Sequence, residues 1–123
     1  MPNDLPKLVF VIAAATVTLA TPSGATQSTS RGQISVAQVL QMLDKSPADR
    51  TAQQVLTAYL AGVGEAASTM VAMGGAMCRA PLSLSAENAR QTLKIVAARD
   101  TGETPATATI VKNMLNRAGC KRQ

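Results

Sequence analysis

The chain has 123 residues and a mass of 12.7 kDa, enough for one domain. Twelve Lys and Arg against seven Asp and Glu give a net charge of +5, and His and Trp are absent. Without His the chain lacks the commonest general base and metal ligand, and Phe10 and Tyr59 are too few aromatic residues to stack on nucleic-acid bases. The composition therefore argues against most enzymes, metalloproteins and nucleic-acid binders.

Residues 1–25 have the features of a secretory signal peptide. The run Leu8–Ala20 carries no charge and is shorter than the roughly 20 residues that a membrane span needs. The small residues Ser23-Gly24-Ala25 follow it and are typical of a cleavage site, so we expect cleavage after Ala25. An uncleaved anchor or a buried helix is the alternative. The expected product is periplasmic and is not inserted into a membrane.

Cys78 and Cys120 are the only cysteines. An even number in an exported chain indicates a disulfide, because the periplasm oxidises paired thiols. The bond would close a loop of about 40 residues, for which the chain-entropy model gives about 4 kcal/mol of stabilisation. Two Cys without His cannot complete a tetrahedral zinc site, and their spacing differs from the C-x-x-C redox motif. We therefore expect a structural disulfide, with no metal and no cofactor.

After the signal peptide, the residue pattern predicts a polar segment and a first helix. Residues 26–33 are polar without periodicity and are expected to form a disordered lead-in. Ser35 and Gln38 then match a capping box at the start of a helix that ends near Lys45.

A second, longer helix is expected to begin with Ser46 as N-cap and Pro47 at the first helical position. It continues toward Met73 and stops at Gly74-Gly75. Its apolar face contains Ala52, Val55, Leu56, Tyr59, Leu60 and Val63.

Two further helices follow a connector that contains Cys78. Ser85 is expected to cap the third helix, and Thr104 with Pro105 is expected to open the fourth, which ends at Gly119. The residues expected to point inward are Ala89, Leu93, Val96, Ala97, Ala108, Val111, Met114 and Leu115. Because no segment alternates with a period of two, the sequence predicts an all-α, four-helix domain over residues 34–123.

The order of these elements, with three short motifs, resembles the Rap/Tai immunity-protein family. The motifs are Tyr59-x-x-Gly62 in the second helix, Cys78-Arg79-Ala80-Pro81 in the connector and a closing Gly119-Cys120. They correspond to the family pattern Y-x-x-G, C-x-P and P-C over Ile34 to Cys120. The chain departs from this pattern by one extra residue before Pro81 and by Gly in place of Pro before Cys120. Leu43 and Leu56 stand where many relatives carry a second cysteine pair.

The resemblance implies a periplasmic immunity protein without enzymatic activity. Such proteins inhibit peptidoglycan amidase effectors of type VI secretion systems by occluding the active site, often as homodimers. The partner would then be a protein, and nucleic acid would not be bound. The alternative is a small periplasmic helical stress or envelope chaperone, although the chain has few carboxylates and no His to sense acid.

Met70, Met73 and Met77 have the spacing of one helical face. Three interpretations of these methionines are open: they fill the core, they form an adaptable binding surface, or their thioether sulfurs bind copper. The connector that follows is anchored by Cys78, and Met and Arg are enriched at protein interfaces. We therefore expect a partner-binding surface formed by Met73, Met77, Arg79 and Leu82.

Three residues of the second helix have predicted structural roles. Gly62 and Gly64 lower helix stability by about 1 kcal/mol each relative to Ala, which favours close packing of a neighbouring helix there. Tyr59 is expected to lie in the core with a hydrogen-bonded hydroxyl.

The basic residues are scattered along the chain, so they form either a solvated surface or a complement to an acidic partner.

Overall fold

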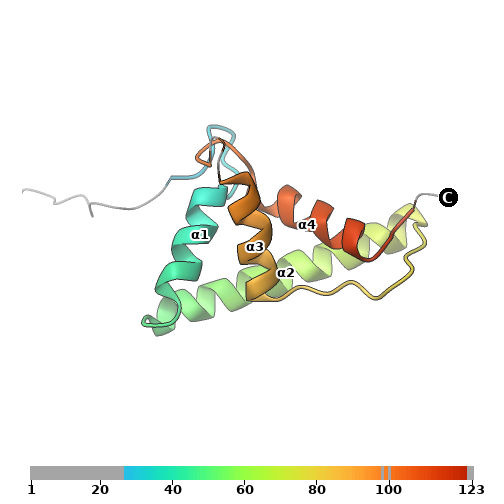
Figure 1. Cartoon of the computed structure of the whole chain (residues 1–123), viewed down its shortest axis with the longest axis horizontal. Coiled ribbons are helices and arrows are strands. Elements are labelled where there is room, and N and C mark those ends of the chain that lie inside the picture. Colours follow the sequence, from blue (N-terminus) through green and yellow to red (C-terminus); the bar gives the residue numbers. More distant parts are fainter. Residues whose placement is uncertain (1–26, 98, 100, 122–123) are drawn as a thin grey trace, which may run out of the picture.

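The computed structural model describes residues 27–97, 99 and 101–121. It contains four helices, α1 (Val36–Lys45), α2 (Arg50–Gly74), α3 (Ala86–Val96) and α4 (Ala106–Arg117) (Figure 1). Two isolated β-bridges occur, and no strand is present in the described part of the chain. The predicted all-α, four-helix fold with one disulfide is confirmed. The expected signal peptide lies outside the described residues.

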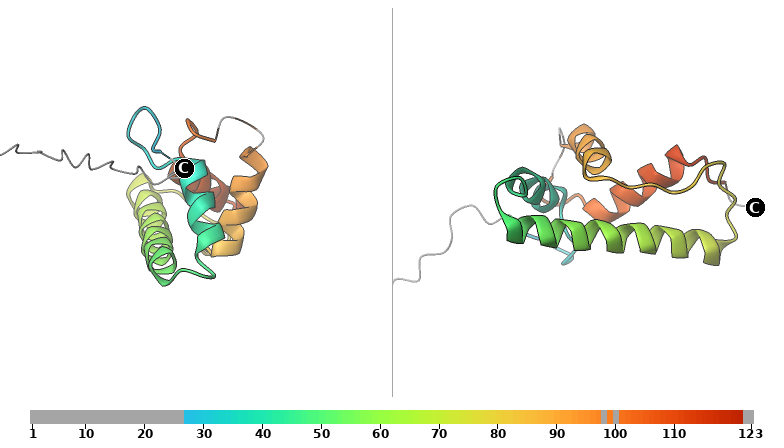
Figure 2. Two further views of the ribbon diagram at one scale, coloured as in Figure 1. Left: turned by 90° about the vertical axis from the view of Figure 1, so that its left-hand side faces the viewer. Right: turned by 90° about the horizontal axis from the view of Figure 1, so that it is seen from below.

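The longest helix, α2, forms the base of the molecule (Figure 1). Helices α1 and α3 stand over its first half, whereas α4 lies along its second half and runs in the same direction (Figures 1 and 2). The connector from Gly75 to Ser85 returns from the end of α2 to the start of α3 (Figure 2). The second half of α2 therefore lies beside a single helix.

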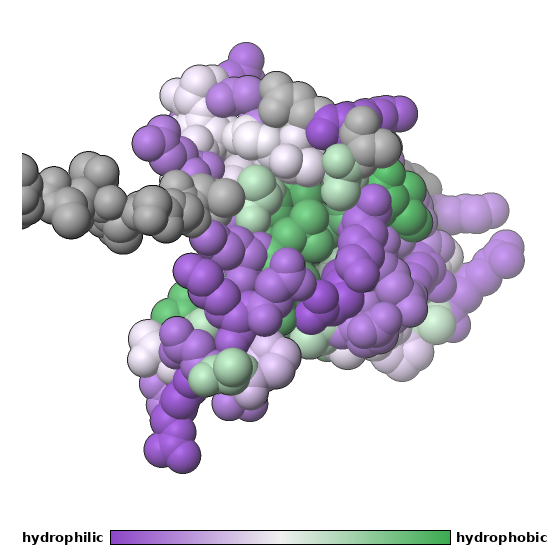
Figure 3. Space-filling view, turned by 60° about the vertical axis from the view of Figure 1, so that its left-hand side comes forward, coloured by the Kyte–Doolittle hydropathy of each residue, from purple (hydrophilic) through white to green (hydrophobic). Residues whose placement is uncertain are grey.

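The hydrophobic core forms where the four helices meet. On the side of α1 and α3, hydrophilic side chains cover most of the surface and hydrophobic residues show between them (Figure 3). The last buried side chain of α2 is Ala67, so the final two turns of this helix extend beyond the core. The buried core residues are Val36, Val39, Leu43, Leu56, Val63, Ala67, Ala89, Leu93, Ala106, Ile110, Val111, Met114 and Ala118.

Three predicted helix ends are confirmed by their hydrogen bonds. The Ser35 hydroxyl accepts from the Gln38 N–H at 3.1 Å, and the Gln38 side chain accepts from the Ser35 N–H at 2.9 Å. The Ser85 hydroxyl accepts from the Asn88 N–H at 3.1 Å at the start of α3. Gly75 ends α2 in the left-handed region, with φ of 61°.

The predicted start of α2 is wrong. Asp49 is the N-cap, and its carboxylate accepts from the Ala52 N–H at 3.1 Å. Ser46 instead ends α1, where its hydroxyl donates to the Leu43 carbonyl. The N–H groups of Ala48 and Asp49 both donate to the Lys45 carbonyl, so residues 46–48 form a turn between the two helices.

The start of α4 also differs from the prediction, because Pro105 rather than Thr104 is the N-cap and no side chain caps the helix. The Ala106 N–H donates to the Ile34 carbonyl, and the Val36 N–H donates to the Thr104 carbonyl. The starts of α1 and α4 therefore satisfy each other's backbone groups, which replaces a side-chain cap.

Residues 27–33 form a hydrogen-bonded turn, which corrects the expected disordered lead-in. Thr29 is buried, and the Ser30 N–H and hydroxyl both donate to the Glu103 carboxylate, the hydroxyl at 2.7 Å. The Ser35 hydroxyl donates to the Gln27 carbonyl at 3.0 Å. The polar composition of residues 27–33 did not predict their ordered conformation, because Glu103, which bonds to Ser30, is distant in sequence.

Most residues predicted to point inward do so, but three are exposed. Val55 on α2 is 51 % exposed, and Ala97 and Ala108 are also at the surface. The apolar arc of each helix is wider than the surface that its neighbours cover. Exposed apolar residues of α2 and α4 also line the candidate site.

Candidate partner-binding surface

The three methionines near the end of α2 lie on the surface. Met70, Met73 and Met77 are 58 %, 84 % and 63 % exposed. The core-filling interpretation is therefore wrong, because α2 extends past the core before it reaches Met70. Large apolar side chains clustered in water are typical of interaction sites.

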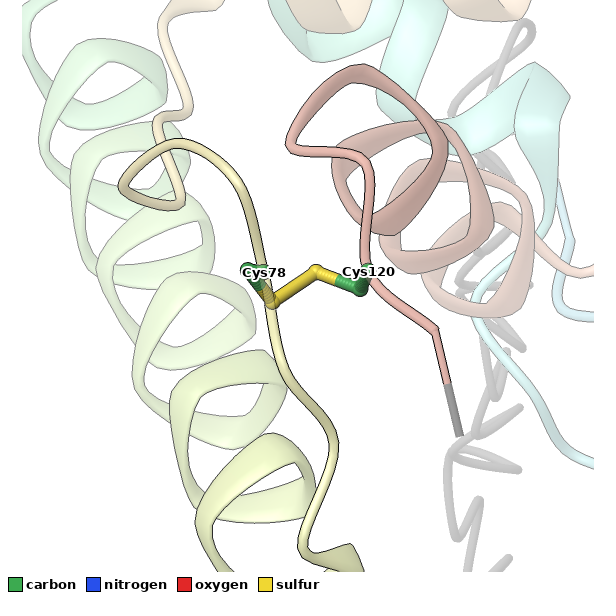
Figure 4. The surroundings of a disulfide bond; sticks show 2 residues. All are labelled: Cys78 and Cys120. Atoms are coloured by element: carbon green, nitrogen blue, oxygen red, sulfur yellow. A yellow bond between two sulfur atoms is a disulfide. The ribbon is translucent and has the colours of Figure 1, made fainter. Parts of the chain in front are cut away.

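Met77 lies next to a covalent joint between the connector and the end of α4. The Cys78 and Cys120 sulfur atoms are 2.02 Å apart, which confirms the predicted disulfide (Figure 4). Met77 and Lys121 exchange two backbone hydrogen bonds of 3.0 and 2.9 Å beside it. The backbone at Met77 is thus held to Lys121, with the disulfide at the next residue, so the start of the connector is an ordered segment.

Leu82 lies apart from the other three predicted contact residues, Met73, Met77 and Arg79. The Arg79 N–H donates to the Ala118 carbonyl, and its side chain lies against Gly119, where an added Cβ would be 3.3 Å from the Arg79 Cδ. The Arg79 stem therefore packs on the end of α4. Leu82 is partly buried and contributes to a groove on the opposite side of α2. The four predicted contact residues are thus divided between the end of the molecule and this second groove.

A groove between α2 and α4 was not predicted. It has a volume of about 820 Å³, and its lining is mainly apolar. Met70 and Val71 line it from α2, and Ala108, Val111 and Leu115 line it from α4. Its remaining lining residues are Gln33, Ile34, Ala66, Gly74, Ala76, Pro105, Thr107, Lys112, Asn116, Cys120 and Lys121. The spacing of Ala108, Val111 and Leu115 marks one helical face, which could have indicated this surface.

The groove on the other side of α2 lies under the connector. It has a volume of about 830 Å³ and includes Leu60, Leu82 and Met114. Glu65, Ser68 and Thr69 make this groove more polar. The Arg117 side chain donates to the Ser83 carbonyl at 2.6 Å and so ties the connector to α4 beside it. We regard this groove as part of how the connector packs.

The residues of the family-like motifs occupy three different environments. Tyr59 is half-buried, and its hydroxyl lies 2.8 Å from the Thr107 hydroxyl, as predicted. Burial raises the pKa of Tyr59, and the hydrogen bond to Thr107 partly offsets this effect. Gly62 and Pro81 are exposed. Apart from the adjacent residues and the backbone of α2 itself, no atom lies within 4 Å of a Cβ built on Gly62 or Gly64, so the predicted close helix packing there is wrong.

Some basic residues have structural partners. The Arg90 guanidinium contacts the Asp44 carboxylate at 2.9 Å and donates to the Leu43 carbonyl at 3.0 Å. It therefore holds the end of α1 against α3. Lys112 and Lys121, in contrast, lie along the α2–α4 groove. Within the part of the chain that the structure describes, neither lysine forms an ion pair.

Helix α2 is long and apolar enough to cross a membrane by length and composition, and 17 % of its most apolar stretch is buried. Within the described ranges, no cluster of His, Cys, Asp or Glu could hold a metal ion.

Comparison of the chain with protein-family models, with curated proteins and with solved structures found no match. The resemblance to the Rap/Tai family therefore rests on the motifs described above.

Proposed function

We propose that the chain is an exported, non-catalytic binding protein of the immunity type. In this proposal it inhibits a peptidoglycan amidase effector of a type VI secretion system in the periplasm by covering the active site. The exposure of Met70, Met73 and Met77 at one end of the molecule is the observation that carries the binding role. The resemblance to the Rap/Tai family supplies the class of partner.

The end of the molecule that carries the three methionines has a rigid backbone, which suits an inhibitor that enters a cleft. The disulfide and the paired hydrogen bonds between Met77 and Lys121 hold the backbone in place before binding. An ordered element loses less conformational entropy on association than a mobile loop does. Methionine side chains remain adaptable and can fit the irregular walls of a partner surface.

The binding role is tested by substitution at this end. Met73→Ala, Met77→Ala and Arg79→Ala are compared for inhibition of a candidate amidase and for melting temperature. We expect the combined Met73→Ala and Met77→Ala variant to lose at least about tenfold in affinity, since buried anchors dominate interface energies. Its melting temperature should stay unchanged because both side chains are exposed.

Ile95→Ala is the matched control, because Ile95 is 78 % exposed and lies on α3, away from the methionines. It should alter neither inhibition nor melting temperature. If the methionine variants inhibit as well as the unmodified protein, the interface lies elsewhere. If no amidase is inhibited or bound at all, the immunity function is wrong.

Export is tested separately by the intact mass of the protein from a periplasmic extract. We expect a mature chain that begins at Thr26, with a mass that shows two fewer hydrogens for the disulfide. A full-length chain in the membrane fraction would contradict both cleavage and periplasmic location.

The exposed methionines and the apolar groove also suit a small envelope chaperone, which is the second candidate function. A chaperone would suppress aggregation of several unrelated unfolded proteins, whereas an inhibitor would form a stoichiometric complex with one folded enzyme. Light scattering of two unrelated aggregating proteins, with and without the oxidised protein, separates the two functions.

A further inference from the structure

We propose that the groove between α2 and α4 binds an acidic amphipathic helix of a protein partner. This inference deepens the proposed function and rests on it, since it assumes that the partner is a protein. It names the element of that partner which is recognised.

The shape of the groove fits one face of a short helix. Ala66, Met70 and Gly74 follow one side of α2 at intervals of four residues, a length of about 12 Å or a little over two helical turns. Met70 and Ile34, which line it, are 58 % and 38 % exposed, so the groove is open to water along one side. An occupant would bury one face and leave its other face in solvent, which is the property of an amphipathic element.

The walls favour a helix over an extended peptide. An extended peptide gains affinity by adding backbone hydrogen bonds to an exposed sheet edge. The long walls of this groove are α2 and α4, whose backbone groups bond within each helix. Ile34 and Lys121, which also line it outside the helices, already form backbone hydrogen bonds with Ala106 and Met77. A helix needs no such bonds and can place apolar residues at i, i+3 or i+4, and i+7 against Met70, Val111 and Leu115.

The charge of the groove specifies an acidic partner. Among the lining residues that the structure describes, the charged ones are Lys112 and Lys121, and none is Asp or Glu. Glu65 lies on the opposite side of α2, in the other groove. Complementary charges speed association and fix the orientation of a partner. A helix with Asp or Glu beside its apolar face would pair with the two lysines, whereas a basic helix would be repelled.

The proposal is tested by selecting peptides with the oxidised, exported protein. A displayed library of random 15-residue peptides is panned on the unmodified protein and, in parallel, on Ala108→Trp, whose indole would fill the groove from α4. We expect enriched peptides with apolar residues at helical spacing and a net negative charge. A synthetic enriched peptide should become helical on binding and should bind Ala108→Trp at least about tenfold more weakly.

Two further variants keep the test independent of folding defects. Ala66→Trp fills the groove from α2, and both alanines are exposed, so the variants should melt with the unmodified protein. The double variant Lys112→Glu and Lys121→Glu should weaken the acidic peptide at least about tenfold at low salt. Lys94→Glu, an exposed lysine on α3, is the matched control and should leave binding unchanged.

Several results would overturn the proposal. These are a selection without enrichment, enriched peptides that lack acidic residues, and peptides that bind both tryptophan variants as well as the unmodified protein. A dimer in sedimentation that Ala108→Trp dissociates would assign the groove to a second copy, and uptake of dodecanoate in place of peptides would assign it to an acyl chain. If both tryptophan variants still inhibit an amidase, this proposal fails while the proposed function stands. If peptides bind the groove but no amidase is inhibited, the groove proposal stands while the proposed function fails.

Discussion

The Tyr59 hydroxyl lies 2.8 Å from the Thr107 hydroxyl and connects the middle of α2 to the first turn of α4. The two residues are far apart in sequence, and their contact sets where the two helices begin to run side by side. The α2–α4 groove begins next to this contact, since Thr107 is among its lining residues.

Tyr59→Phe should lower the free energy of unfolding by about 1 kcal/mol, because it removes one hydrogen bond and leaves the Thr107 hydroxyl without this partner. Urea unfolding followed by circular dichroism measures the change. Thr107→Val should cost a similar amount, and the double variant should cost less than the sum of the two. Additive losses would show that the two hydroxyls do not interact.

Stability should fall in alkaline solution through Tyr59. Because burial raises its pKa above the ordinary value of 10.0, folding favours the neutral phenol. This contribution is complete below pH 10 and is lost as the pH rises through the folded-state pKa. Ultraviolet titration of the phenolate locates that pKa, and the Tyr59→Phe variant should lack this part of the alkaline loss.

Cys120→Ser should lower the free energy of unfolding by about 2–4 kcal/mol, because the disulfide limits the conformations of the unfolded chain. The measurement compares thermal melts of the oxidised protein, the reduced protein and the variant. The reduced protein and Cys120→Ser should melt together. Coincident melts of the oxidised and reduced proteins would contradict the prediction.

Two glycines of the second helix should respond in opposite ways to alanine. Gly62→Ala should stabilise the protein by about 0.5–1 kcal/mol, since the position is helical and, beyond the adjacent residues and the backbone of α2, no atom lies within 4 Å of the new Cβ. Gly75→Ala should destabilise it by about 1 kcal/mol, because the left-handed φ of 61° is unfavourable with a side chain. Equal effects of the two substitutions would contradict the assigned end of α2.

Glu103→Ala should release residues 27–33 without unfolding the domain, since the carboxylate accepts both hydrogen bonds from Ser30. We expect faster tryptic cleavage after Arg31, which lies in this turn, and a change in stability below about 1 kcal/mol. Glu87→Ala removes a carboxylate on α3 and is the control. Equal cleavage rates in the two variants would show that Glu103 does not hold the turn.

The sequence allowed prediction of the features that depend on neighbouring residues. The capping box of Ser35 and Gln38, the Ser85 cap and the stop at Gly75 each depend on a few adjacent positions. The disulfide followed from the count of two cysteines. Such signals are local, so they do not require knowledge of how the helices pack.

The missed features depend on contacts between distant segments. Ser30 in residues 27–33 is held by Glu103, and the starts of α1 and α4 satisfy each other through Ile34 and Thr104. The spacing of Met70 and Met73 correctly suggested a shared face, but whether that face is covered depends on the position and length of α4. The spacing of Ala108, Val111 and Leu115 marks one wall of the groove, but the groove itself forms only where α4 lies beside α2.

The joint at Met77 and Lys121 also affects how the molecule opens locally. The last turns of a helix ordinarily fray first, and their amide hydrogens exchange with solvent most readily. The end of α2 is instead held a few residues beyond its last turn by a covalent bond. In the oxidised protein, amides near Gly74 should therefore exchange more slowly than their exposure suggests. Reduction should speed exchange in the final two turns of α2 before it affects the core around Leu56.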